Sequence, residues 1–77
     1  MAGIAMSRLL VECGEALYGP QWQTQLARDL GISDRTMRRW VASGEYPIGV
    51  HIDLLRLTIE RAQTLDDLAT RLRAAGS

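Results

Sequence analysis

The chain has 77 residues with 47% hydrophobic and 23% charged residues, which is the composition of one small folded domain, 1–77, and not of a disordered segment. Nine basic and nine acidic residues give zero net charge, which argues against a strongly basic overall field. The single cysteine excludes an internal disulfide, and no apolar run has the ~20 residues of a membrane span or the pattern of a secretory signal. We expect a cytoplasmic protein with no membrane contact.

The first part of the chain predicts two amphipathic helices. Residues 6–18 place apolar side chains at three- and four-residue spacing, and the pair Gly19 and Pro20 ends this pattern. Residues 21–30 repeat the pattern and end before Gly31, which suits the left-handed conformation that closes a helix. The two expected apolar faces are Leu9, Leu10, Cys13, Ala16 and Leu17, and then Trp22, Leu26, Ala27 and Leu30.

A third helix is expected directly after this glycine. Ser33 offers a hydroxyl group as the N-cap, and Asp34 places a negative charge in the first turn. The apolar stripe of this helix is Met37, Trp40 and Val41. Its opposite face then carries Asp34, Arg35, Thr36, Arg38 and Arg39.

The remaining sequence predicts two more helices. Residues 49–62 form the fourth. Thr64 and Asp67 follow its end and resemble a capping box that starts a separate fifth helix, 64–74. The fourth helix is expected to bury some of the side chains of Val50, Ile52, Leu55, Ile59 and Ala62. The expected fold is all-α, a compact bundle of about five short helices.

The connection between the second and third helices has specific steric requirements. Two steeply crossing helices joined by a short turn approach closely, so the position four residues before the turn glycine must be small, and Ala27 occupies it. Gly31 can adopt the positive φ that the turn needs, Ile32 can anchor the turn on the core, and Ser33 can cap the next helix.

With these positions filled, residues 23–40, QTQLARDLGISDRTMRRW, resemble the DNA-binding motif of the lambda-repressor and Cro-like (XRE-type) family. The resemblance covers about residues 6–62 and places a helix-turn-helix, helices 2 and 3 of the bundle, at 23–41. It implies a small single-domain regulator of a kind found in phages and other mobile elements. Autoregulatory repressors, antitoxins and anti-CRISPR-associated regulators are examples of this kind.

The resemblance also implies that the third helix is a recognition helix in the major groove of double-stranded DNA. The side chains expected to contact bases are Asp34, Arg35, Arg38 and Arg39. The side chains expected to contact phosphates are Gln23, Thr24, Thr36, Ser43 and Tyr46. Arg35 and Arg39 are spaced i and i+4, which suits neighbouring guanines. Asp34 either accepts a hydrogen bond from cytosine or serves only to cap the helix or orient Arg38. The alternative for the three arginines is an ordinary solvated face.

A narrow stripe of Leu65, Leu68 and Leu72 has two interpretations, as ordinary core or as a contact between two copies. We expect the second, because so small a domain buries little surface by itself. The expected function is therefore a transcriptional regulator, a repressor, that binds a palindromic operator as a homodimer. Zero net charge leaves an alternative open, a protein–protein adaptor module on the same scaffold.

The other notable side chains have structural interpretations. Trp22 and Trp40 lie on apolar stripes and are expected in the core, and Cys13 is interpreted as a small buried hydrophobic residue. His51 has no metal-type partner three or four residues on. We expect no catalytic residues, no metal, no cofactor and no small-molecule ligand, and hence no enzyme.

Overall fold

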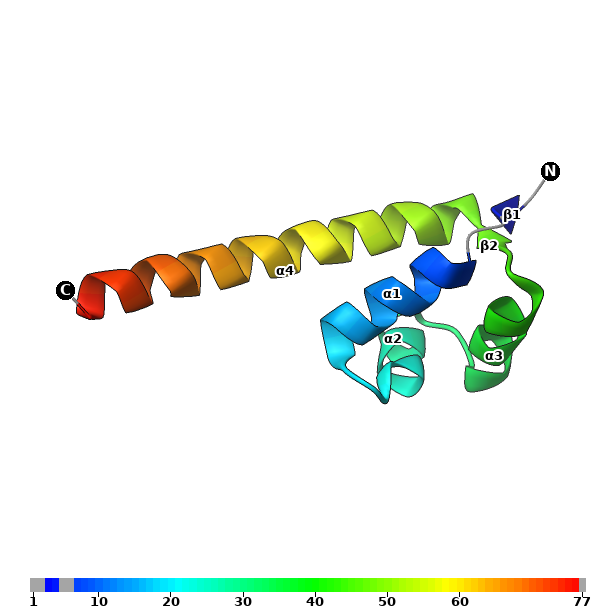
Figure 1. Ribbon diagram of the computed structural model, residues 1–77. Helices are drawn as coiled ribbons and strands as arrows, with labels where there is room; N and C mark the ends of the chain where they lie inside the picture. The colour runs from blue at the N-terminus through cyan, green and yellow to red at the C-terminus, as the bar shows by residue number, and fades with distance from the viewer. Residues whose placement is uncertain (1–2, 5–6, 77) are drawn as a thin grey trace.

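The computed structural model describes residues 3–4 and 7–76 and is built almost entirely of helix, so the chain is all-α (Figure 1). Four helices lie within this described part. They are α1 Ser7–Tyr18, α2 Trp22–Leu30, α3 Asp34–Ser43 and α4 Ile48–Ala75. Two strands of two residues each, β1 Gly3–Ile4 and β2 Tyr46–Pro47, pair antiparallel with Ile4 opposite Tyr46. This pairing holds the start of the chain beside the segment that leads into α4.

The first three helices and the beginning of α4 surround one small core, which we call the body. Every element from α1 onwards contributes a nearly inaccessible side chain to it, because each helix turns its apolar stripe inward. The buried side chains are Leu10, Leu17, Trp22, Leu26, Ala27, Met37, Tyr46 and Leu54. Trp22 thus lies in the core as predicted, whereas Trp40 and Cys13 are half-buried at its edge.

The contact between α1 and α2 depends on a residue without a side chain. Gly14 on α1 is buried under the indole ring of Trp22, the first residue of α2. A Cβ atom at position 14 would lie 2.1 Å from Cε3 of that ring. The two helices can therefore approach as they do only because Gly14 leaves this space empty.

The expected break at residue 64 is absent, so the prediction of five helices is wrong and the structure has four in its described part. The hydroxyl of Thr64 does not cap a new helix but donates to the carbonyl of Glu60, 3.1 Å away and one turn earlier in α4. No glycine or proline occurs between Val50 and Ala75, so nothing in the backbone chemistry interrupts the helix. α4 runs without interruption for 28 residues.

The predicted buried face of α4 is also largely wrong. Val50 is half-buried, but Ile52 and Leu55 are 59% and 57% exposed, and Ile59 is 48% exposed. The helix instead turns Leu54 and Leu57 to the body. Periodicity alone could not separate the two faces, because apolar side chains lie on both sides of this helix.

The second half of α4 extends beyond the body, so the expectation of a compact bundle holds only for the first part of the chain (Figure 1). The molecule measures 51 × 24 × 20 Å, and its long dimension follows α4. Arg61 donates from Nη1 to the carbonyl of Leu17 at the end of α1, 2.8 Å away. We call residues 62–76, which follow that hydrogen bond, the overhang; all of them are exposed except the half-buried Ala69. No helix in the described residues is long and apolar enough to span a membrane.

A polar contact joins the ends of α1 and α2. The hydroxyl of Tyr18 donates to Oδ2 of Asp29. Burial, followed by the hydrogen bond and the negative charge of Asp29, raises the pKa of Tyr18 to about 12. Because the neutral phenol is the form that this contact favours, its contribution to stability is present at neutral pH and is lost as the phenol ionises.

The Gly14 contact predicts opposite effects for two glycine-to-alanine substitutions. Gly14→Ala should lower the free energy of unfolding by about 1–3 kcal/mol, because the new methyl group overlaps the indole ring of Trp22. Gly49→Ala is the matched control: no atom lies within 4 Å of the added Cβ, and α4 should gain up to about 1 kcal/mol from alanine. Urea unfolding followed by circular dichroism measures both, and equal stability of the two variants would contradict the close contact.

The Tyr18–Asp29 contact predicts a loss of stability at alkaline pH. The pKa of Tyr18 is raised in the folded state from its ordinary value of 10.0 to about 12, so the free energy of unfolding should fall as the pH rises through this interval. Asp29→Asn should lower the pKa of Tyr18, followed by NMR of its ring carbons, and should flatten this fall. Asp53→Asn, on exposed α4, is the control and should change neither. An unchanged Tyr18 titration in Asp29→Asn would refute the contact.

Candidate nucleic-acid interface

A three-residue turn, 31–33, joins α2 to α3. Gly31 has φ 72° and ψ 31°, the left-handed conformation that the sequence predicts for it. Its N–H donates to the carbonyl of Arg28, 3.1 Å away, and the N–H of Ile32 donates to the carbonyl of Ala27, 2.9 Å away. These two hydrogen bonds close the end of α2 and fix the direction in which the chain leaves it.

Ser33 then starts α3. Its backbone is extended, and its Oγ accepts a hydrogen bond of 3.1 Å from the N–H of Thr36. The same hydroxyl donates to Oγ1 of Thr36, 3.0 Å away. Thr36, expected as a phosphate contact, is therefore half-buried and engaged in the cap. The first turn of α3 is held in place before any ligand binds.

The core beneath the turn sets how α3 is rotated about its axis. Ala27 on α2 is 1% exposed, which leaves room for the helices to approach, and Leu26 and Met37 are fully buried between them. Trp40 and Val41 pack half-buried against the same core. Since these side chains point inward, the residues between them on α3 must point outward.

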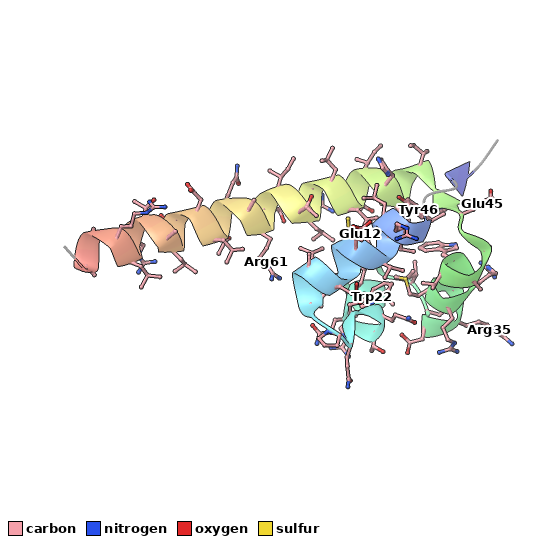
Figure 2. The ribbon with its side chains drawn as sticks, in the orientation of Figure 1. Glu12, Trp22, Arg35, Glu45, Tyr46 and Arg61 are labelled. Atoms are coloured by element: carbon pink, nitrogen blue, oxygen red, sulfur yellow. The ribbon has the colours of Figure 1, made fainter. Side chains whose placement is uncertain are left out.

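The outward face of α3 carries the four residues expected to contact bases. Asp34, Arg35, Arg38 and Arg39 are all exposed, and Figure 2 shows Arg35 extending away from the body. No carboxylate of residues 7–76 forms an ion pair with any of these three arginines. Nor does Asp34 contact Arg38 in the described chain, so the expectation that Asp34 orients it is not supported. The result is an exposed face with three unpaired arginines and one carboxylate, that of Asp34.

The beginning of α2 has a polar surface of its own. Gln23 and Thr24, both expected as phosphate contacts, are exposed and line a shallow hollow of about 470 Å³. Sequence reasoning missed the other residues around it, which are Pro20, Gln21, Gln25 and Arg28. Arg28 follows Thr24 by four residues on the same helix, and this spacing was the signal that could have identified it.

Two of the expected phosphate contacts are placed differently. The hydroxyl of Ser43 is engaged in the loop after α3, where it accepts from the N–H of Glu45 at 3.2 Å. Tyr46 is 1% exposed, its hydroxyl lies 3.1 Å from Nδ1 of His51, and burial raises its pKa. Its position in a polar loop suggested exposure, but its ring fills the core between β2 and α4. Tyr46 is therefore a core residue and not a phosphate contact.

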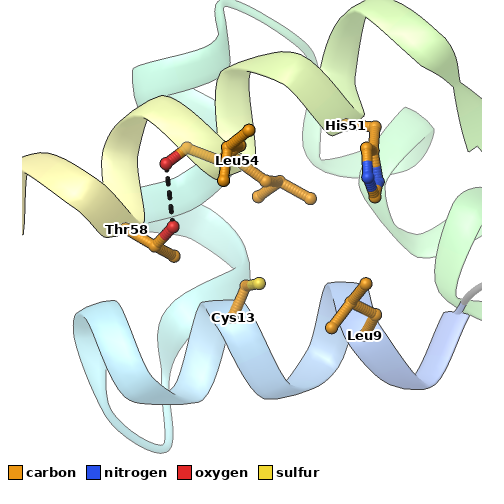
Figure 3. Close-up of a pocket in the computed structure, with 6 residues that line it drawn as sticks. Leu9, Cys13, His51, Leu54 and Thr58 are labelled. Carbon is orange, nitrogen blue, oxygen red and sulfur yellow. Dashed lines mark hydrogen bonds between the residues drawn. The ribbon is translucent and has the colours of Figure 1, made fainter.

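A separate apolar groove lies between α1 and α4, on the other side of the body (Figure 3). It has a volume of about 200 Å³ and is lined by Leu9, Cys13, His51, Leu54, Leu55 and Thr58. Burial, and then the nearby charge of Glu12, raise the pKa of the Cys13 thiol. The thiol is thus neutral at physiological pH, and the groove is a largely uncharged, apolar surface.

The chain matches no protein-family model, no curated protein and no solved structure.

The Ser33 cap predicts a local effect on stability. Ser33→Ala should lower the free energy of unfolding by about 1 kcal/mol, because the N–H of Thr36 loses its acceptor. Ser33→Asp retains an acceptor and should stay close to the unsubstituted protein. Urea unfolding of the three proteins measures the difference. If Ser33→Ala were as stable as the parent, the cap would contribute nothing to α3.

Proposed function

We propose that this chain is a sequence-specific DNA-binding transcriptional regulator, a repressor, in which α2 and α3 form a helix-turn-helix. The observation that carries the proposal is the outward face of α3, where Arg35, Arg38 and Arg39 are exposed and form no ion pair with residues 7–76. Arginines that serve only for solubility do not require a helix whose orientation is fixed. Here a positive-φ glycine and a side-chain cap hold the helix that displays them.

The geometry of α3 favours contact with base edges. Arg35 and Arg39 are one turn apart on the same side of the helix, so that their guanidinium groups can address neighbouring base pairs. The O6 and N7 atoms of guanine accept two parallel hydrogen bonds from one guanidinium group, which makes guanine the preferred base. Asp34, in the first turn, is the acceptor suited to the exocyclic amine of cytosine. The proposed half-site is therefore rich in G·C pairs.

The start of α2 is suited to the DNA backbone. The polar hollow beside Gln23 and Thr24 places amide and hydroxyl groups near the free N–H groups of the first turn of α2. Arg28 adds a positive charge at its rim. A phosphate held there fixes the position of the protein along the duplex and leaves the reading of sequence to α3.

The resemblance to lambda-repressor and Cro-like regulators supports the same function and adds an oligomeric state. A homodimer places two copies of α3 on the two halves of a palindromic operator. Dimerisation also makes DNA binding compatible with zero net charge, because two modest basic faces that act together replace one strongly basic surface. Leu65, Leu68 and Leu72, all exposed on the overhang, supply the contact between the copies.

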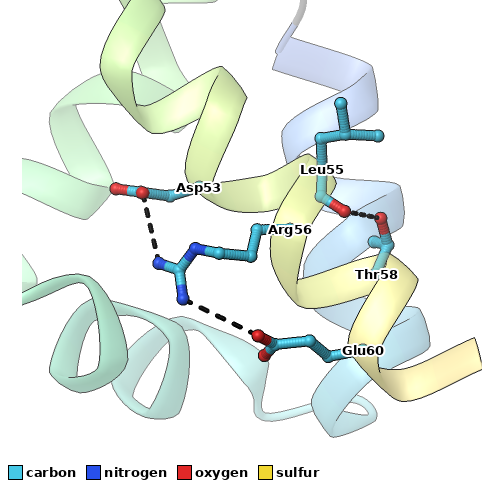
Figure 4. Close-up of polar contacts among 5 residues, drawn as sticks. All are labelled: Asp53, Leu55, Arg56, Thr58 and Glu60. Carbon is cyan, nitrogen blue, oxygen red and sulfur yellow. Dashed lines mark hydrogen bonds and ion pairs between the residues drawn. The ribbon is translucent and has the colours of Figure 1, made fainter. Parts of the chain in front are cut away.

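The decisive prediction concerns Arg39. After selection of duplexes from a random-sequence pool by the protein itself, Arg39→Ala should bind the selected duplex about 10- to 100-fold more weakly, because a bidentate base contact is lost. Fluorescence anisotropy at two salt concentrations measures the affinity. Arg56→Ala is the matched control: Arg56 is also exposed, but it lies on α4 and pairs with Asp53 and Glu60 (Figure 4). This control should retain full affinity.

The opposite outcome identifies the alternative function. If no sequence is enriched, and if binding to duplex is equally weak for Arg39→Ala and the parent protein, α3 does not read DNA. The same scaffold would then act as a protein–protein adaptor module. Circular dichroism of Arg39→Ala checks that the substitution leaves the fold intact.

A further inference from the structure

We infer that the overhang of one copy lies in the α1–α4 groove of a second copy. The two α4 helices then pair antiparallel, and each overhang lies in the groove of the other copy. The inference deepens the homodimer of the proposed function and rests on it. Instead of a simple pairing of two leucine stripes, it assigns the overhang a specific binding site, the groove of the other copy. The ligand of the groove is then a second copy of this chain.

The first observation is that the overhang and the groove share one strip of α4. The residues of this strip alternate in steps of four and three along the helix, which is the spacing that keeps side chains on one side of a paired helix. We call this strip the α4 seam. It consists of His51, Leu55, Thr58, Ala62, Leu65, Ala69 and Leu72. The first three residues line the groove, and the last four belong to the overhang.

The second observation is that large and small side chains match in one antiparallel register. When Leu55 lies opposite the partner's Leu72, Ala62 lies opposite the partner's Leu65, and Thr58 opposite the partner's Ala69. Each leucine of the middle layers therefore meets an alanine, which fills space without overlap. Parallel pairing would place Ala62 against Ala62 and Ala69 against Ala69 and would leave voids between leucine layers.

The third observation is the fit of the end of the overhang to the groove. In this register the partner's Leu72, 72% exposed in the single chain, points into the groove between Leu9 and Leu55, both also exposed. The groove volume of about 200 Å³ is sufficient for one such side chain. Leu68 faces the same side of α4 as Leu54 and Leu57, so it packs against the partner's α1.

The arrangement also places both DNA-binding faces on one side. The side of α4 that meets the body lies about 80° around the helix from the α4 seam, at about 100° per residue. A twofold axis between antiparallel helices then leaves both bodies on the same side of the pair. Figure 1 shows α2 and α3 on the side of α1 away from α4, so both copies of α3 point away from the paired helices. The first turns of the two α4 helices lie about 45 Å apart.

The test uses the native Cys13, which lines the groove. In Leu72→Cys, the new thiol should lie beside the partner's Cys13. A short bismaleimide at mildly alkaline pH should then give a covalent dimer in which Cys13 of one copy is linked to position 72 of the other. Within one chain, position 72 is about 21 Å further along α4 than Thr58, so this linkage cannot form internally. Mass spectrometry of the digested dimer identifies the linked residues.

Two controls make the result specific. Ala74→Cys introduces a thiol in the same overhang but about 160° around the helix, and it should give no linkage to Cys13. Cys13→Ser combined with Leu72→Cys should give no covalent dimer, because the two copies of position 72 lie about 25 Å apart in the antiparallel pair. Light scattering of Leu65→Asp, expected to be monomeric, checks the same interface without chemistry.

Each other outcome overturns the inference. A dimer linked through position 72 of both copies, in the variant that combines Cys13→Ser with Leu72→Cys, shows parallel pairing. If the protein is a dimer in solution but Cys13 and position 72 are not linked, the groove does not bind the partner's overhang. If the parent protein is a monomer, the antiparallel pair of α4 helices is excluded altogether. These results are independent of the selection of duplexes. The linkage without an enriched DNA sequence refutes the DNA-binding proposal alone. An enriched sequence without the linkage refutes only the placement of the overhang in the groove.

Discussion

The close contact between Gly14 and Trp22 determines how the body is assembled. Because the indole ring packs directly on the backbone of α1, the first residue of α2 is held at a fixed position along α1 and a fixed distance from it. Ala27, one turn and a half further along α2, then allows α3 to cross closely, and the turn at Gly31 sets its direction. A body with so few buried side chains has little other means of positioning α3, so its orientation follows from this sequence of close contacts.

The local features of the body could be predicted from the sequence. The ends of α2 and α3 follow from Gly31 and Ser33, whose backbone and side-chain chemistry admit few alternatives. The outward placement of Arg35, Arg38 and Arg39 followed from the inward placement of Met37 and its neighbours. The role of these arginines, in contrast, remains a proposal, since side-chain exposure does not identify a ligand.

The features that could not be predicted depend on contacts between distant segments. Tyr46 has the sequence context of a polar loop residue, and only its packing beside His51 and α4 shows that it belongs to the core. Thr64 matches a capping signal, but no glycine or proline lies near it, and the helix continues through it. The core face of α4 was misassigned because its opposite side is equally apolar, which reflects a surface that the single chain leaves uncovered.

Because α4 is continuous, it is a rigid spacer that fixes both a distance and a rotation about its axis. In the inferred dimer, its length sets the distance between the two bodies, while its helical repeat sets the direction in which each body faces. Insertion of one residue before the overhang would turn the overhang by about 100° and remove Leu72 from the groove. Insertion of about seven residues would almost restore the direction. Variation among related chains should therefore favour changes of α4 length in steps of about seven residues.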